Sequence, residues 1–211
     1  MTIRLTAAMF CVSVLLMAQT KLLPVDESAS DPQFAAFYKA FRTAVAQKNA
    51  KALLDTLDPE VQSEIDGDKG SKAFDKHWNP SNPASKVWSE LAVVIALGGS
   101  FSTEQGTKMF CAPYIYSKFP DAVDSFGHGV ILGAGVPLRS RPDDGAPVKG
   151  KLSYDIVKVP DWGVNLPWIR VVTGTGTGYV RRTEIRSPSD FRVCFHRKNG
   201  RWMLRWLVAG D

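Results

Sequence analysis

The sequence has few of the residues from which catalytic centres are usually built. Only three histidines occur, His77, His128 and His196, and none belongs to an HExxH motif or to a cysteine–histidine zinc spacing. The acidic stretch 64–68 lacks the spacing of a calcium-binding loop. The glycine-rich segment 172–178 has no phosphate-binding lysine and is not followed by a predicted helix. We therefore expect no metal, no cofactor and no catalytic residues, which argues against an enzyme.

Long hydrophobic runs are also scarce, and the longest one opens the chain. Arg4 is followed by an apolar run of 14 residues that ends in a Leu-x-Ala cleavage pattern at Leu16 and Ala18. A helix that spans a bilayer needs about 20 such residues. We predict a signal peptide over residues 1–18 and a periplasmic or secreted mature protein without a transmembrane segment. A retained membrane anchor is the alternative.

Cysteine is as rare as histidine, with three in the chain. Cys11 leaves with the predicted signal peptide, so the mature chain keeps Cys111 and Cys194. An even pair in an oxidising compartment is a candidate disulfide, and two separate buried thiols are the alternative. A hydrolase built from Cys111 and His128 is disfavoured, because Cys111 lies in a strand-like segment without the helix start that lowers the pKa of a nucleophile.

The charges divide the chain into two parts. Residues 26–68 hold nine acidic and four basic side chains, whereas residues 139–211 hold seven acidic and fourteen basic ones. This difference predicts units with different surfaces. A basic face on an exported protein suits anionic lipid, a wall polymer or an acidic partner, and nucleic acid is not expected there. A solvated basic face without a partner is the alternative.

Helix signals dominate the predicted N-terminal domain, residues 31–118. Asp31-Pro32 is typical of a helix cap followed by a first-turn proline, and an aromatic stripe follows at helical spacing. Asn49 and Ser85 are further caps. Asp58-Pro59 is interpreted as a helix stop and a turn. Two extended segments, 109–112 and 114–116, are expected near the end of this domain.

Asn199-Gly200 predicts a β-hairpin over residues 189–211, packed on the N-terminal part. The expected pairs on its core-facing side are Arg197/Trp202, Phe195/Leu204 and Val193/Trp206, with Trp202 and Trp206 as anchors. The opposite face is expected to carry Cys194, His196, Met203 and Arg205.

Residues of about 130 to 187 resemble a bacterial Src-homology-3-like (SH3b) domain. The segment 136–142, VPLRSRP, is similar to the family's opening strand, and APVKGKL at 146–152 is similar to the next strand. Trp168-Ile169-Arg170-Val171 and the later GTGYV at 176–180 match its closing signature. The resemblance implies a small SH3-like β-barrel over residues 129–188. Together with the helical N-terminal part and the C-terminal hairpin, this predicts an overall α+β fold. The family's usual glycine is replaced by Ser153-Tyr154-Asp155.

The flanks show a weaker resemblance to nuclear-transport-factor-2-like cone folds. It rests on residues 46–78, with Ala-Leu-Leu, an Asp-Pro turn and a Phe-x-x-x-Trp pair, and on the terminal hairpin at 191–209. This resemblance implies an alternative function, in which a cone-shaped pocket that includes His77 serves a small ligand or an enzyme reaction.

The SH3b resemblance implies a recognition groove lined by aromatic rings, with arginines that hold carboxylates. The candidate ligand-binding residues are Tyr154, Trp162, Trp168, Tyr179, Arg139, Arg141 and Arg181. Of these, Trp162 is expected to be the most exposed, while barrel core is the alternative for Trp168 and Tyr179. We predict a non-enzymatic binding protein of the cell envelope that recognises peptidoglycan stem peptides or an envelope protein. A role as inhibitor or immunity partner stays open.

Overall fold

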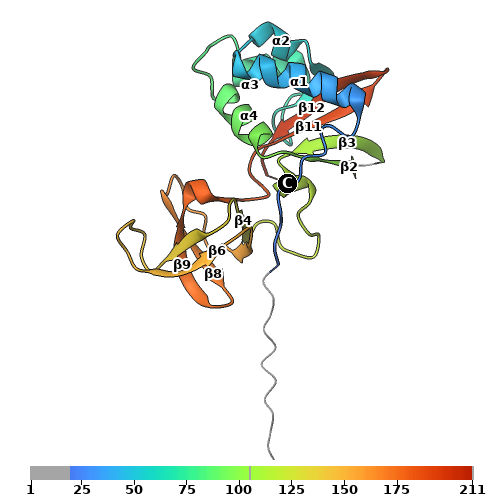
Figure 1. The fold of residues 1–211 in the computed structure, drawn as a ribbon. Helices are drawn as coiled ribbons and strands as arrows, with labels where there is room; N and C mark the ends of the chain where they lie inside the picture. The colour runs from blue at the N-terminus through green and yellow to red at the C-terminus, as the bar shows by residue number, and fades with distance from the viewer. Residues whose placement is uncertain (1–19, 105, 211) are drawn as a thin grey trace, which may run out of the picture.

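The helices and strands form two β-sheets, with most of the helices packed on one of them (Figure 1). The computed structural model describes residues 20–104 and 106–210. The predicted signal peptide, residues 1–18, lies outside the described residues. The elements are α1 (Pro32–Ala46), α2 (Ala50–Leu54), β1 (Leu57–Gln62), α3 (Ser71–Trp78), α4 (Lys86–Ala96), β2 (Ser100–Glu104), β3 (Thr107–Ala112), α5 (Tyr114–Ser117), β4 (His128–Ile131), β5 (Val136–Arg139), β6 (Val148–Leu152), β7 (Ile156–Lys158), β8 (Trp168–Thr173), β9 (Gly176–Arg181), the 3-10 turn η1 (Arg182–Glu184), β10 (Ile185–Arg186), β11 (Arg192–Lys198) and β12 (Arg201–Val208).

Helices α1, α2 and α4 begin at the caps that the sequence indicates. The Asp31 carboxylate accepts from the backbone N–H groups of Gln33 and Phe34, and Asn49 and Ser85 cap α2 and α4 in the same way. Such caps satisfy backbone donors that a helix start leaves unpaired. Among the described residues, no helix is long and apolar enough to cross a membrane.

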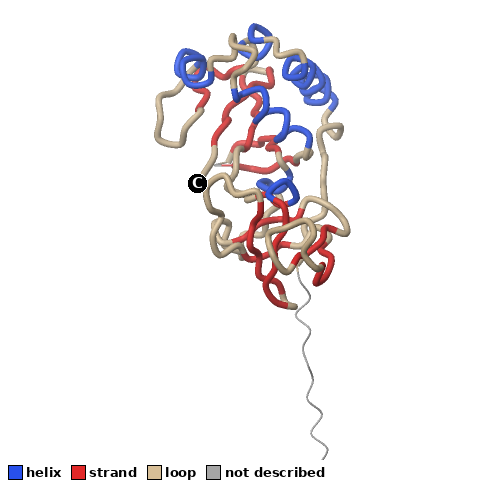
Figure 2. The backbone as a smooth tube through the Cα atoms, turned by 90° about the vertical axis from the view of Figure 1, so that its left-hand side faces the viewer, coloured by secondary structure: helices blue, strands red, loops and turns tan. Residues whose placement is uncertain are grey.

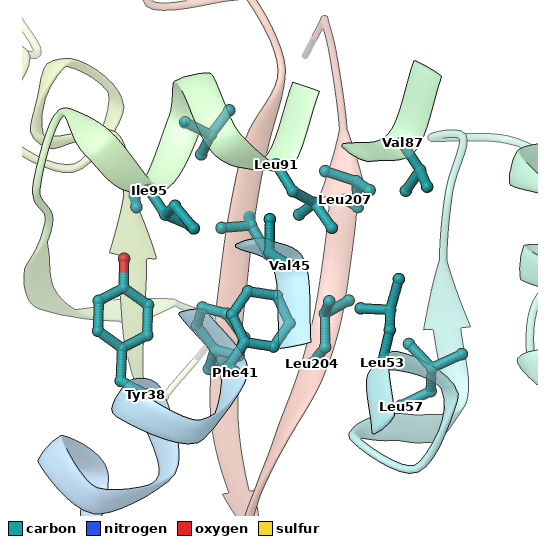
Figure 3. Close-up of a cluster of buried hydrophobic side chains, with 14 of the residues drawn as sticks. Tyr38, Phe41, Val45, Leu53, Leu57, Val87, Leu91, Ile95, Leu204 and Leu207 are labelled. Carbon is teal, nitrogen blue, oxygen red and sulfur yellow. The ribbon is translucent and has the colours of Figure 1, made fainter. Parts of the chain in front are cut away.

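The five-stranded sheet has the order β1-β12-β11-β3-β2, so it combines strands from both ends of the described chain. Every strand of the second sheet lies between β3 and β11 in sequence. One face of the five-stranded sheet is covered by α1 and α4, and aliphatic and aromatic side chains from both layers interdigitate there (Figure 3). Phe34, Phe41, Phe110 and Phe195 are fully or almost fully buried at this centre. The fold is therefore α+β, as predicted.

Strand β1 replaces the helix stop and turn expected at Asp58-Pro59. It pairs in parallel with β12, with Leu57 opposite Leu204 and Gln62 opposite Trp206. Proline has no N–H to give to a ladder, and β1 tolerates Pro59 because it is the edge strand. The strand partners are far apart in sequence, which is why local residue patterns did not indicate the strand.

The terminal hairpin contains a β-bulge that changes which side chains face the helices. Arg197 pairs with Trp202 and Phe195 with Leu204, as predicted, but the register shifts between Cys194 and Phe195. Val193 consequently pairs with Leu207, and Trp206 pairs with Cys194. An extra residue in one strand turns the following side chains to the other face. Trp202 lies in the main core, whereas the expectation that Trp206 anchors the same core is wrong.

Residues 114–116 form part of α5 rather than the extended segment that the sequence indicated. Ile115 and Tyr114 of this helix belong to a separate buried cluster with Leu22, Val130 and Ile156. This cluster joins the N-terminal segment, α5 and the second sheet. It therefore provides an apolar contact between the two halves of the molecule that Figure 2 shows, the helix-rich half and the half formed mainly by strands and loops.

The second sheet has seven strands in the order β10-β4-β7-β8-β9-β5-β6, and all neighbours are antiparallel. Its inner side chains, among them Ile169, Val171 and Val180, form a core of their own. No pairing joins β10 to β6 within the described part of the chain, so no closed barrel is seen. The short segment 20–22 lies alongside the start of β7. Lys21 forms a β-bridge with Asp155, and Ile156 N donates to the Thr20 carbonyl at 2.8 Å.

Candidate functional site

The outer side of strands β5, β9 and β8 brings together four of the seven predicted ligand-binding residues. Directly opposite residues of an antiparallel pair lie on the same face. The register places Trp168 opposite Arg181, Arg170 opposite Tyr179, and Arg139 opposite Tyr179. The neighbouring residues Ile169, Val171 and Val180 point into the core. The outer side therefore carries two aromatic rings among three arginines, and we call these five residues the basic aromatic face.

Close packing between β5 and β9 holds this face in place. Gly178 lies beside Tyr179, and a Cβ atom at Gly178 would come within 2.5 Å of Leu138 Cδ1 and 2.9 Å of the Arg139 carbonyl. A side chain at this position would push the two strands apart. The missing Cβ is therefore what lets Arg139 approach Tyr179 across the sheet.

Arg181 shows how a carboxylate can bind at the basic aromatic face. Its guanidinium carbon lies 4.9 Å from the centre of the Trp168 ring, a cation–π distance. Its Nε donates to Asp144 Oδ1 at 3.0 Å, and its second nitrogen donates to Asp144 Oδ2. This two-pronged contact is the geometry by which arginine recognises carboxylates. The carboxylate bound in this way is that of Asp144, from the loop after β5.

The loop after β5 is tied to the same face. Arg139 donates from its guanidinium to the Ala146 carbonyl at 2.9 Å, which fixes the end of the loop. Arg141 is exposed within this loop, beside the basic aromatic face rather than on one of its strands. Arg170, by contrast, is exposed on β8 and belongs to the face, although it is not among the predicted ligand-binding residues. The alternation of β8 was the signal that could have found it.

Trp162 does not have the exposure that we expected. It is half-buried, packs against the core of the seven-stranded sheet, and donates from its indole N–H to the Phe126 carbonyl at 3.0 Å. A Cβ atom at Gly129 would lie 2.6 Å from the ring, so the indole fills the space above that glycine. The Arg182 guanidinium lies 5.3 Å from the ring centre. The loop that carries Trp162 folds back on the sheet, so Trp162 has a structural role.

Tyr154 also lies apart from the basic aromatic face. Its backbone has a positive φ of 59°, and its carbonyl accepts from Leu22 N at 2.8 Å. Beside it, Lys21 Nζ donates to Asp155 at 2.9 Å and to the Ser153 carbonyl at 2.7 Å. The turn that contains Tyr154 therefore receives the N-terminal segment.

A cluster of charged side chains lies on the five-stranded sheet, where no functional residues are predicted from the sequence. Asp58 is fully buried, and its Oδ2 lies 2.7 Å from His196 Nε2. Lys198 and Arg205 bring cationic nitrogens within 3.5 Å and 3.6 Å of the same carboxyl group. Burial opposes ionisation of Asp58, but the Glu60 N–H, His196 and Lys198 outweigh it and lower the pKa of the carboxyl group. All groups of the cluster are mutually paired, so it joins β1, β11 and β12.

Cys111 and Cys194 form a disulfide between directly opposite residues of β3 and β11, with their Cα atoms 4.2 Å apart. Both residues are fully buried, on the sheet face that α1 and α4 do not cover. The bond removes Cys111 as a nucleophile, so the structure gives no support to a Cys111/His128 hydrolase. Nor does any group of three or more His, Cys, Asp or Glu side chains within residues 20–104 and 106–210 suit a metal ion.

Buried aromatic side chains pack closely between the helices and the five-stranded sheet, where the alternative function expects a cone-shaped pocket. The rings of Phe34 and Phe110 lie 4.4 Å apart by their centres, and Phe41 and Phe195 lie 4.9 Å apart. His77, which the alternative function placed in such a pocket, is exposed on α3 and lies 3.5 Å from Glu64.

Comparison with known proteins adds little to this geometry. No family model matches the chain, so the SH3b resemblance receives no support from that comparison. No curated protein matches either. A solved structure of a designed protein of the nuclear-transport-factor-2-like type aligns with 85% of this chain and 100% of its own, at 13% sequence identity. Its TM-score of 0.29 is too low to establish a shared fold.

Proposed function

We propose that the protein is an exported, non-enzymatic binding protein of the cell envelope, and that its basic aromatic face binds peptidoglycan stem peptides. The observation that carries this proposal is the pairing of Arg181 with Asp144 beside the ring of Trp168. An extended peptide with free carboxylates would meet the same guanidinium and the same ring.

The finer fold assignment belongs to the same proposal. We take residues 129–188 to be an SH3-like unit, on the strength of the sequence resemblance. The succession of short antiparallel strands, with the turn η1 directly before β10, supports that assignment. The outer side of such a unit is available to extended ligands, and flat aromatic rings suit them.

The chemistry of the face suits a chain that is both acidic and partly apolar. Trp168 and Tyr179 provide flat apolar surface, and the guanidinium groups of the three arginines provide N–H donors that suit carboxylate oxygens. Lys149 and Lys151 are exposed on the neighbouring β6 and extend the positive charge. Binding of this kind weakens as salt screens the charges.

The compartment is proposed from two features. The sequence opens with the layout of a secretory signal. In addition, a disulfide is the expected state of paired cysteines in an oxidising environment, and Cys111 and Cys194 are bonded. Together they support a periplasmic or secreted location.

The experiment is sedimentation of the purified protein with purified sacculi. Arg170→Ala is the informative variant, because this exposed side chain can be removed without opening the core. Arg201→Ala, an exposed arginine on β12 of the other sheet, is the matched control for the loss of one positive charge. We expect wild type and Arg201→Ala to sediment with the sacculi, and Arg170→Ala and Trp168→Ala to stay largely in solution.

Equal retention of all four proteins would place wall binding elsewhere on the molecule. If no protein sediments, peptidoglycan is not the ligand. Cross-linking in envelope extract would then test whether the same face binds an envelope protein.

A further inference from the structure

A groove runs between α1 and α4 on the helical side of the molecule, far in sequence from the basic aromatic face. Its volume is about 530 Å³, within the usual range of small-ligand sites. The walls are lined largely by small residues, among them Ala35 and Ala46 of α1 and Ala92 and Ala96 of α4. Larger side chains at these positions would fill the space between the helices. The alanines therefore leave an open apolar trough.

One polar atom of the groove lacks a partner. Tyr38 lines the groove and is only 2% exposed, and its hydroxyl makes no hydrogen bond among the described residues. Figure 3 shows the hydroxyl pointing from α1 toward Ile95 of α4, which also lines the groove. The ring is held by Phe34, whose centre lies 5.2 Å away. A buried hydroxyl without a partner is destabilising, and a ligand oxygen at this position would satisfy it.

The charges around the groove favour an anion. Lys39 and Arg42 line it, on the helix turn that carries Tyr38. Burial first, and then the carboxylate of Asp26, raise the pKa of Tyr38, so its hydroxyl stays protonated and available as a donor. Lys39 and Arg42 thus bring two cations to the groove, whereas Asp26 does not line it. The polar end of the groove thus presents donors to an acceptor-rich group.

We infer that this groove binds a small apolar carboxylate, with the hydrocarbon part against the alanines and the carboxylate at Tyr38 and Arg42. The site is separate from the basic aromatic face and does not depend on its function. Octanoate is a suitable probe, because it combines a flexible apolar chain with one carboxylate.

The test is a titration of the isotope-labelled protein with sodium octanoate, followed by amide NMR shifts. We expect saturable shifts at Ala35, Thr43, Ala92 and Ala96, which line the groove. Tyr38→Phe removes the hydroxyl and keeps the ring, and it should raise the Kd about tenfold. Arg42→Gln should raise it similarly, whereas Arg201→Gln on the distant hairpin should leave it unchanged. Octan-1-ol, which has the same chain without the charge, should bind more weakly than octanoate.

Several outcomes would overturn the inference. The first is the absence of saturable shifts in wild type up to about 10 mM octanoate. The second is an equal Kd for wild type and Tyr38→Phe, when the NMR spectra show that both proteins are folded. Equal binding of octanol and octanoate would remove the carboxylate from the proposed ligand. Sedimentation with sacculi is independent of all three, so either proposal can fail alone.

Discussion

Asp58 and His196 hydrogen-bond across the five-stranded sheet at 2.7 Å, although 138 residues separate them in the sequence. The bond ties the parallel edge strand β1 to the terminal hairpin, together with the contacts of Asp58 to Lys198 and Arg205. It therefore connects the segment that follows α2 to strands β11 and β12.

This pairing makes the free energy of unfolding depend on pH in the acidic range. The pKa of Asp58 is lowered in the folded protein, so its contribution is fully present above its unfolded pKa of about 4 and is lost as the pH falls through the folded value. Asp58→Ala leaves His196 without its buried partner, and we expect it to cost about 3 kcal/mol at pH 7. Urea unfolding of wild type and Asp58→Ala, from neutral to acidic pH, measures the difference in their free energies of unfolding. The difference between them should shrink as the pH falls, and a constant difference would contradict the electrostatic explanation.

The disulfide should be a large part of the stability of the helical half. It closes a chain segment of 83 residues, for which the chain-entropy model gives about 4.5 kcal/mol. We expect the Cys111→Ala/Cys194→Ala double variant to unfold at much lower urea concentration. Because both residues are fully buried, a mild reductant without denaturant should leave the native bond intact, as thiol counting will show. Ready reduction of the folded protein would mean that the strands open locally.

The two tryptophans of the seven-stranded unit should respond differently to truncation. Trp162 packs on the core and bonds to the Phe126 carbonyl, so Trp162→Ala should cost about 3 kcal/mol. Trp168 lies on the outer side, and Trp168→Ala should cost about 1 kcal/mol. Thermal unfolding and sedimentation with sacculi separate stability from binding. Loss of binding with little loss of stability is expected for Trp168 alone.

On the proposed function, an external carboxylate has to displace Asp144 from Arg181. Asp144→Asn removes the charge and frees the guanidinium, and we expect retention on sacculi to increase by several fold. Asp143→Asn, a neighbouring exposed aspartate of the same loop, is the control for net charge. An equal gain in both variants would show that general charge, rather than release of Arg181, governs binding.

Local patterns in the sequence predicted the elements whose signals are local. Helix starts at Asp31 and Ser85 and the Asn199-Gly200 hairpin depend on residues within one turn of each other, and all three form. The outward alternation of Trp168 and Arg170 along β8 also depends on spacing alone, but it was not used, and Arg170 was missed.

What sequence reasoning missed depends on distant partners. β1 is a strand because β12 lies beside it, and its proline gives the opposite local signal. One bulged residue in the hairpin moved Trp206 to the face of the disulfide, where its indole donates to Gln62. Trp162 was expected to be exposed because its loop is polar and contains glycine, yet the space above Gly129 receives the ring.

The order of the five-stranded sheet also has a consequence for how the molecule assembles. Strands β11 and β12 lie between β1 and β3 in the sheet but follow all the other strands in sequence, so β1 can join β2 and β3 in one sheet only after β11 and β12 have been made. In the seven-stranded sheet, β5 pairs with β6 and β8 pairs with β9. These partners are close in sequence, so they can pair early in folding. We therefore expect the intervening unit to fold first, and the helical half to mature only after β11 and β12 have been synthesised.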